Sequence, residues 1–212
     1  QLVLVFPESD MLPPAIDTLK LLSQPPLRVQ YTGAPTRAEF HARDLSRLLN
    51  QMRGLHLGIA LGGGGARGIA HIGVLDACQR AGIHFDRVAG TSAGAIVAAA
   101  YAAGIPLSRV LEVFTHEMTP PAALRWIPKS PQWYMLAVFR FGLAEAKFRR
   151  YLFDYTFEQL LLPAQLVTVD LVSGEHRVRQ SGDVVNSVLE SINHPVFGRP
   201  ILRNGEALVD GG

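Results

Sequence analysis

Two hydrophobic periods alternate along this chain of 212 residues. Short apolar runs at residues 2–6, 55–61 and 85–89 predict strands, and the second run has the composition of a buried strand. After the second run, apolar residues recur every three or four positions, which predicts a helix over residues 69–82. After the third run, an alanine-rich stretch predicts a helix over residues 93–103, which stops at Gly104-Ile-Pro106. This alternation is typical of an α/β fold, so we expect three layers, α/β/α, with a mostly parallel central sheet.

The first part of the chain predicts one more helix. Thr36-Arg-Ala-Glu39 matches a capping box, in which the first and fourth side chains satisfy amide groups at a helix start. The helix should therefore begin there and run through Gln51, with Gly54 just past its end.

The last part of the chain returns to strands and ends in a hairpin. Residues 165–178 predict a strand, a Ser-Gly turn and a second strand, and residues 183–192 predict a helix. Asn204-Gly205 lies between two apolar-containing runs, which is the strongest short signal for a hairpin. This hairpin should deliver Asp210 to the end of a strand.

Composition and charge restrict the class of protein. A hydrophobic content of 48% suits a folded domain with a substantial core. The formal net charge of +2 gives no indication of a nucleic-acid partner. Cys78 is the single cysteine, which excludes an internal disulfide and favours a reducing, cytoplasmic compartment. The first residues have no signal-peptide pattern and resemble the middle of a strand, so we expect this chain to be part of a longer one.

One uncharged run has the length of a membrane span. It covers the 21 residues 88–108. Most of these residues are alanine, glycine and small polar residues, and Pro106 interrupts the run. Such weak apolarity favours a helix that packs tightly on a sheet over a helix in lipid.

The segment 125–150 differs from the rest of the chain in charge and aromatic content. It holds six basic residues and one acidic residue, Glu145, and two tryptophans are interleaved with the basic residues. Such a segment suits peripheral contact with anionic lipid at the inner face of a membrane. A variable insertion that covers the core is an equally good interpretation.

Four consecutive glycines, Gly62 to Gly65, follow the strand predicted at residues 55–61. The pattern from Gly63 to Gly68 matches the dinucleotide-binding fingerprint, with Asp86 near the distance expected for a ribose contact. The same geometry suits another chemistry, because amides at a helix start can stabilise the oxyanion formed during acyl transfer. The next turn decides between them.

That turn is Gly90-Thr-Ser-Ala-Gly94, a G-x-S-x-G sequence between a predicted strand and an alanine-rich helix. A nucleophile elbow requires this context, because flanking glycines avoid steric clashes in a sharp turn that exposes the serine hydroxyl. We therefore favour Ser92 as a nucleophile over Ser92 as an ordinary N-cap.

A nucleophilic serine needs a base. A Ser-His-Asp esterase would have to combine Asp170 with His176 or His194, and neither histidine lies in a turn with a catalytic pattern. Asp210, followed by two glycines at a predicted strand end, is the better candidate. Because an ordinary aspartate has a pKa of about 3.9, the fold would have to hold it directly against Ser92.

Three motifs together carry a resemblance to a known family. They are GGGARG at Gly63–Gly68, GTSAG at Gly90–Gly94 and DGG at Asp210–Gly212, and in this order they resemble the patatin-like phospholipase family. The resemblance covers about residue 55 to the end. The residues upstream resemble the neuropathy-target-esterase branch, in which cyclic-nucleotide-binding-like domains often precede the hydrolase.

The resemblance implies a patatin-like fold and a Ser-Asp dyad that hydrolyses phospholipids or lysophospholipids without a metal or a cofactor. Carried over by position, Ser92 is the nucleophile, Asp210 is the general base and Arg67 has a positioning role. The oxyanion hole falls on the amides of Gly63, Gly64 and Gly65. The remaining motif residues support the turns: Gly68, Gly90, Gly94, Gly211 and Gly212.

The resemblance also divides the chain. Residues 1–54 are expected to form a flanking strand and helix segment, and residues 55–212 the patatin-like domain. Domains of this family normally continue beyond the DGG motif, so we expect the C-terminal part of the domain to lie beyond Gly212.

Overall fold

The computed structural model describes residues 2–9, 12, 26–34, 38–117 and 119–212. Its strands are β1 Val3–Pro7, β2 Leu27–Thr32, β3 Glu39–Phe40, β4 Gly58–Leu61, β5 Arg87–Thr91, β6 Ala164–Asp170, β7 His176–Arg179, β8 Ile201–Arg203 and β9 Glu206–Asp210. Its α-helices are α1 Ala42–Arg53, α2 Ile69–Arg80, α3 Ala93–Ala102, α4 Leu107–Glu112, α5 Ser130–Arg140, α6 Leu143–Leu152 and α7 Val184–Ser191. Short helical turns are η3 Gly65–Gly68, η4 Val113–Glu117, η5 Ala122–Leu124 and η6 Phe157–Gln159.

The strands form two sheets. The smaller sheet has the order β1-β2-β3, and the larger one has the order β4-β5-β6-β9-β8 with β7 paired to β6. Strands β4, β5 and β6 run parallel, whereas β7, β8 and β9 pair in antiparallel fashion. The α/β class is confirmed, and within it the central sheet is mixed. The antiparallel part comes from the two hairpins expected in the last third of the chain.

Strand β6 brings two distant strand ends together. Its residues 164–167 pair with β5 and its residues 168–170 pair with β9. Because β7 pairs with residues 166–169, β5 and β9 must share the opposite edge of β6. There β5 ends at Thr91 opposite Val167, and β9 ends at Asp210 opposite Thr168. The ends of β5 and β9 therefore meet at adjacent positions of one strand.

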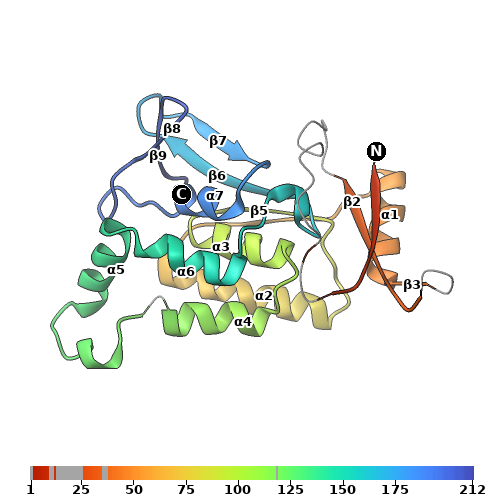
Figure 1. Ribbon diagram of the computed structural model, residues 1–212, viewed down its shortest axis with the longest axis horizontal. Coiled ribbons are helices and arrows are strands. Elements are labelled where there is room, and N and C mark those ends of the chain that lie inside the picture. The colour runs from red at the N-terminus through yellow and green to blue at the C-terminus, as the bar shows by residue number, and fades with distance from the viewer. Residues whose placement is uncertain (1, 10–11, 13–25, 35–37, 118) are drawn as a thin grey trace.

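The core lies between the larger sheet and the helices that cover one of its faces. Figure 1 shows α2, α3, α4 and α6 on this side of the sheet. Alternate residues of β6, from Ala164 to Asp170, are buried, which is the period of a strand with one face on the core. Helix α3 is buried along nearly its whole length. Its alanines let it approach the sheet closely, as expected for a run of weak apolarity.

The predicted strands and helices differ from the observed ones mainly in the first part of the chain. Glu39 belongs to strand β3, and α1 starts at Ala42 after His41, so the predicted capping box is wrong; Thr36 lies outside the described residues. Gly54 ends the helix in a left-handed conformation with φ 68°. Strand β4 is an edge strand, and Leu61 is its one buried residue. The prediction of a buried strand at residues 55–61 is therefore wrong.

The hairpin at the end of the chain is confirmed. Asn204 and Gly205 form its turn with φ values of 52° and 81°. Two successive positive φ angles match the twist of antiparallel strands, which explains the preference for Asn-Gly. The hairpin carries Asp210 as the last residue of β9.

Within the described part of the chain, the helices fall short of the length and apolarity needed to cross a bilayer.

Candidate active site

Ser92 lies in the sharp turn between β5 and α3, with φ 52° and ψ −126°. This backbone conformation is unusual for a residue with a side chain and marks local strain. The turn closes only because its neighbours are glycines. A Cβ on Gly90 would lie 2.4 Å from the carbonyl oxygen of Gly94, and one on Gly94 would lie 2.1 Å from the carbonyl oxygen of Leu61. The glycines are therefore required both by the turn itself and by its packing against the end of β4.

Asp210 lies against Ser92. The Ser92 hydroxyl donates a hydrogen bond of 2.7 Å to Oδ2 of Asp210, across 118 positions of sequence. The other carboxylate oxygen, Oδ1, accepts from the Gly212 amide at 3.0 Å. The backbone amide of Asp210 donates to the carbonyl of Asn193 at 3.0 Å. The fold thus fixes both the backbone and the carboxylate of Asp210.

The glycine loop borders the same hydroxyl. A Cβ on Gly63 would lie 3.2 Å from Cβ of Ser92, so the backbone of this loop passes directly beside the serine. Gly64 and Gly65 have φ values of 144° and 56°, which side chains rarely tolerate. Gly68 packs on Ala93 so closely that a Cβ would lie 2.4 Å from the alanine methyl group.

The DGG motif also borders the site, next to the end of β5 and the glycine loop. A Cβ on Gly211 would lie 2.4 Å from the carbonyl oxygen of Val167 and 2.8 Å from Oγ1 of Thr91. A Cβ on Gly212 would lie 3.7 Å from Cα of Gly63. The three glycine-containing motifs of the sequence therefore converge around one serine. Arg67 lies in η3 next to them and is exposed.

The dinucleotide interpretation does not fit this geometry. Asp86 lies just before β5, at the amino end of the strand, whereas the glycine loop follows the carboxyl end of the parallel strand β4. Its carboxylate accepts from the Leu57 amide at 2.8 Å and from the side chain of Asn50. Asp86 is therefore a structural residue that joins α1 to the domain.

The structure does not assemble the alternative histidine triad around Ser92. His194 accepts a hydrogen bond from the Val196 amide, and His176 lies in β7 opposite Val169. The hydroxyl and amide of Ser173, together with the Ala207 amide, hold the pKa of Asp170 down to about 2. Asp170 thus stabilises the β6–β7 turn and the neighbouring strand β9.

Two polar residues at the site were not expected from the sequence. Ser191 at the end of α7 accepts a hydrogen bond of 2.9 Å from the Ser92 amide. His71 on α2 contacts the carbonyl of Gly62 through Nε2 at 2.9 Å. A signal for Ser191 does exist in the sequence, because it follows Val184 and Val188 at helical spacing and so belongs to the apolar face of α7.

Comparison with known proteins gives a family and longer relatives. A family model described as patatin-like phospholipase matches residues 59–212. "Neuropathy target esterase sws" from Drosophila grimshawi is 31% identical over 180 residues, and the protein of this name from Drosophila melanogaster is also 31% identical. Each alignment covers 80% of this chain and 12% of the relative. The chain therefore spans a small part of the length of these relatives.

A solved structure shares the fold. The crystal structure of VipD from Legionella pneumophila has a TM-score of 0.52 and 14% sequence identity. The match covers 94% of this chain and 52% of VipD. At this identity the likeness concerns the arrangement of helices and strands.

Proposed function

Since the chain belongs to the patatin-like phospholipase family, we propose that it is a serine lipid acyl hydrolase with Ser92 as nucleophile and Asp210 as general base. The observation that carries this proposal is the 2.7 Å hydrogen bond from the Ser92 hydroxyl to the Asp210 carboxylate. A nucleophile and its base must lie within hydrogen-bond distance, and here no third residue separates them.

The first step is acylation. As Oγ of Ser92 bonds to the ester carbonyl carbon, the serine proton moves to Oδ2 of Asp210. The carbonyl oxygen becomes an oxyanion, which the amides of Gly63, Gly64 and Gly65 stabilise. The tetrahedral intermediate then collapses, its carbon–oxygen bond to the leaving alcohol breaks, and Asp210 returns the proton to that alcohol.

The second step is hydrolysis of the acyl-enzyme. Water attacks the acyl carbon and gives a proton to the Asp210 carboxylate. When the bond to Oγ breaks, that proton returns to Ser92, and the fatty acid leaves. In each step Asp210 takes up one proton and gives one up, so the dyad returns to its starting state.

We propose a phospholipid or lysophospholipid as the substrate. The family description and the word esterase in the names of the relatives support hydrolysis of a carboxylic ester. Arg67, exposed beside the glycine loop, is suited to position an anionic head group or the loop itself.

Kinetics of four variants test the dyad on one soluble short-chain ester. Ser92→Ala should abolish turnover, and Asp210→Asn should lower it by about 10²-fold or more, because the amide cannot take the serine proton. His176→Ala and His194→Ala are the controls and should retain turnover. Covalent labelling of Ser92 by a fluorophosphonate, located by peptide mapping, checks the nucleophile independently.

Three results would contradict this function. A folded Asp210→Asn variant with a near-normal rate would exclude Asp210 as the base, and an inactive His194→Ala variant would indicate a histidine instead. A saturable thermal shift with millimolar NAD would favour a dinucleotide site, because a ligand of the folded state raises its stability.

We also propose that residues 125–150 contact an anionic membrane surface. Phe148 and Val138 are buried, so part of the segment covers the core, but Trp126 is 91% exposed and Phe141 76% exposed. Large apolar side chains next to basic residues suit a lipid interface. Figure 1 shows α5 at the same end of the molecule as the C-terminus, near which Asp210 lies.

Vesicle binding tests this surface. The triple variant Lys129→Gln, Arg140→Gln, Arg150→Gln should bind anionic vesicles more than about 10-fold more weakly than the unmodified protein, and binding should weaken with salt. Arg149 is left in place because it pairs with Asp183 at the start of α7. Hydrolysis of the soluble ester should not change. Equal binding to neutral and anionic vesicles would contradict an electrostatic contact.

A further inference from the structure

The end of helix α7 and the residues just after it contact both members of the proposed dyad. Ser191 contacts the backbone of Ser92, and Asn193, two residues further, contacts the backbone of Asp210. One short segment therefore touches both residues, although they lie in different strand ends.

The hydrogen bonds of Ser191 leave one consistent arrangement of its proton. The hydroxyl donates to the carbonyl oxygen of Val167 at 2.6 Å. A serine hydroxyl has a single proton, so toward Ser92 its oxygen must act as the acceptor. The Ser92 amide donates to it at 2.9 Å. Ser191 is completely buried, so in the folded protein bulk water does not compete for this contact.

This contact acts on the strained part of the site. Ser92 has φ 52°, a strained conformation that persists only where the surroundings hold it. The hydrogen bond to Ser191 fixes the amide of this same residue. The same hydrogen bond occupies the Ser92 amide, so this amide is not available to the oxyanion, which is assigned to the amides of the glycine loop.

On the other side, Asn193 holds Asp210. Its carbonyl accepts from the Asp210 amide at 3.0 Å, and its side-chain amide donates to the carbonyls of Arg199 and Leu208. Asn193 is buried. The residue therefore links the end of α7 to β9 by two hydrogen bonds and to the segment before β8 by a third.

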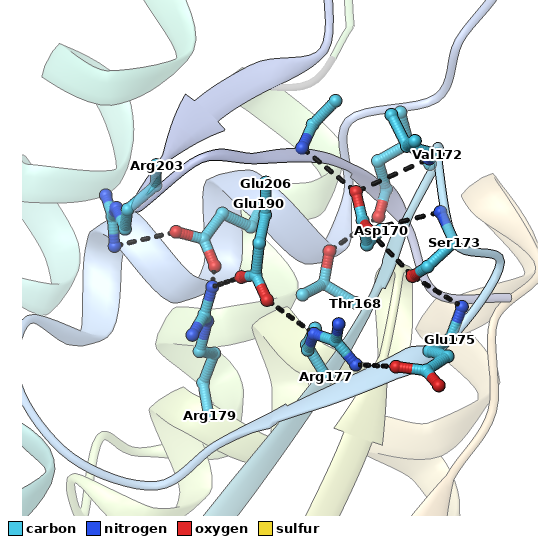
Figure 2. Close-up of polar contacts among 12 residues, drawn as sticks. Thr168, Asp170, Val172, Ser173, Glu175, Arg177, Arg179, Glu190, Arg203 and Glu206 are labelled. Atoms are coloured by element: carbon cyan, nitrogen blue, oxygen red, sulfur yellow. Dashed lines mark hydrogen bonds and ion pairs between the residues drawn. The ribbon is translucent and has the colours of Figure 1, made fainter.

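Ion pairs anchor this helix end to the strands. Glu190 is completely buried beside Ser191 and pairs with Arg179 of β7 and Arg203 of β8. Figure 2 shows the pairs continuing from Arg179 to Glu206 of β9 and from there to Arg177. The end of α7 is thus fixed independently of Ser92, as a support must be.

We infer that Ser191 is a positioning residue, which holds the Ser92 backbone so that its hydroxyl reaches Asp210. The inference rests on the proposed function of Ser92 as the nucleophile. Ser191 does not touch the reacting atoms, so its loss should slow the reaction without changing the affinity for substrate.

Ser191→Ala is the test, with Ser187→Ala as the matched control. Ser187 lies one turn earlier on α7, is also buried, and its hydroxyl donates to the carbonyl of Asp183, away from the dyad. Both changes remove one buried serine hydroxyl from one helix. Ser191→Ala should lower kcat and the rate of fluorophosphonate labelling by about 10-fold or more, as expected for a misplaced nucleophile, with KM unchanged. Ser187→Ala should leave all three values within about 2-fold of the unmodified protein, because Ser187 makes no contact with the dyad.

Ser191→Cys keeps the approximate size of the side chain but offers a weaker hydrogen-bond partner. Its labelling rate should therefore lie between those of Ser191→Ala and the unmodified protein. This variant also preserves the test if Ser191→Ala fails to fold. Equal labelling rates in Ser191→Ala and Ser187→Ala would overturn the positioning role, as would an unchanged rate in Ser191→Cys. Unmodified protein that is not labelled at Ser92 would instead overturn the proposed function, and the inference with it.

Discussion

The two members of the proposed dyad are held in opposite ways. Ser92 lies in a turn fixed by close packing, where glycines at positions 90 and 94 leave no space for a methyl group. Asp210 lies at the end of a hairpin held by hydrogen bonds and ion pairs from α7, β6 and β7. Close packing shapes the turn at Ser92, to which Ser191 adds one hydrogen bond, whereas polar contacts predominate around Asp210.

This difference predicts different sensitivities. Packing in the turn depends on shape, so a single added methyl group should strongly lower the free energy of unfolding. Changes of pH should have little effect on this packing. The contacts around β9 depend on charge, so neutral replacements and acid should weaken them gradually. The three predictions below test this contrast.

Gly94→Ala should have the largest effect. The new methyl group would lie 2.1 Å from the carbonyl oxygen of Leu61, and this backbone belongs to a paired strand that cannot move aside. We expect a loss of more than about 3 kcal/mol of unfolding free energy, or no folded protein, measured by urea denaturation.

Gly73→Ala is the control for this prediction. Gly73 lies inside α2, and a Cβ there would meet no atom within 4 Å. Alanine is the better helix former by about 1 kcal/mol, so this variant should be as stable as the unmodified protein or more stable. A Gly94→Ala protein with the same stability would show that packing does not fix the nucleophile turn.

Glu190→Gln should have an intermediate effect. The change removes the charge that Arg179 and Arg203 share, but both arginines are partly exposed and Arg179 retains Glu206. We expect a loss of about 2 kcal/mol of unfolding free energy, typical of hydrogen bonds to charged groups. Glu145→Gln, which breaks an exposed pair with Arg149, should cost less than about 0.5 kcal/mol. Equal losses in the two variants would argue against an anchoring role for Glu190.

Asp170→Asn should have the smallest effect on the free energy of unfolding, and this effect should depend on pH. Hydrogen bonds from Ser173 and the Ala207 amide lower its pKa in the folded protein from 3.8 to about 2. A lowered folded pKa stabilises the protein above the unfolded pKa, and this stabilisation is lost as pH falls through the folded value. The stability difference between the unmodified protein and Asp170→Asn should therefore be constant above about pH 5 and shrink from about pH 4 toward pH 2.

Urea denaturation of both proteins between pH 7 and pH 2.5 measures this difference. Asp76→Asn serves as the control, because Asp76 forms an exposed ion pair with Arg80 on α2 and should make little difference at neutral pH. A difference between Asp170→Asn and the unmodified protein that grows on acidification would contradict the direction of the pKa shift.

Many elements could be predicted from the sequence because their causes are local. Asn204-Gly205 forces a tight hairpin through its own backbone preferences, and the spacing of apolar residues predicted α2 and α7. The alanine-rich run after Ser92 predicted α3. The capping box predicted at Thr36 and Glu39 was wrong because it rested on local chemistry alone. Pairing of Glu39 and Phe40 with β2 overrides that local preference.

The sequence by itself determined which residues are the candidates for chemistry and which motifs present them. The pattern of glycines around Ser92 and after Asp210 is visible in a few adjacent letters and predicts tight turns. Of the clashes that require these glycines, the one between Gly90 and Gly94 is local, whereas Gly94 meets Leu61 and Gly211 meets Val167.

Only the tertiary structure decided how these turns meet. The distance between Ser92 and Asp210 follows from the register in which β5 and β9 pair with Val167 and Thr168 on β6. The role of Ser191 also depends on where α7 packs, 99 positions away from Ser92. Strand register and helix packing result from side chains distributed over the whole core, so no short stretch of sequence contains them.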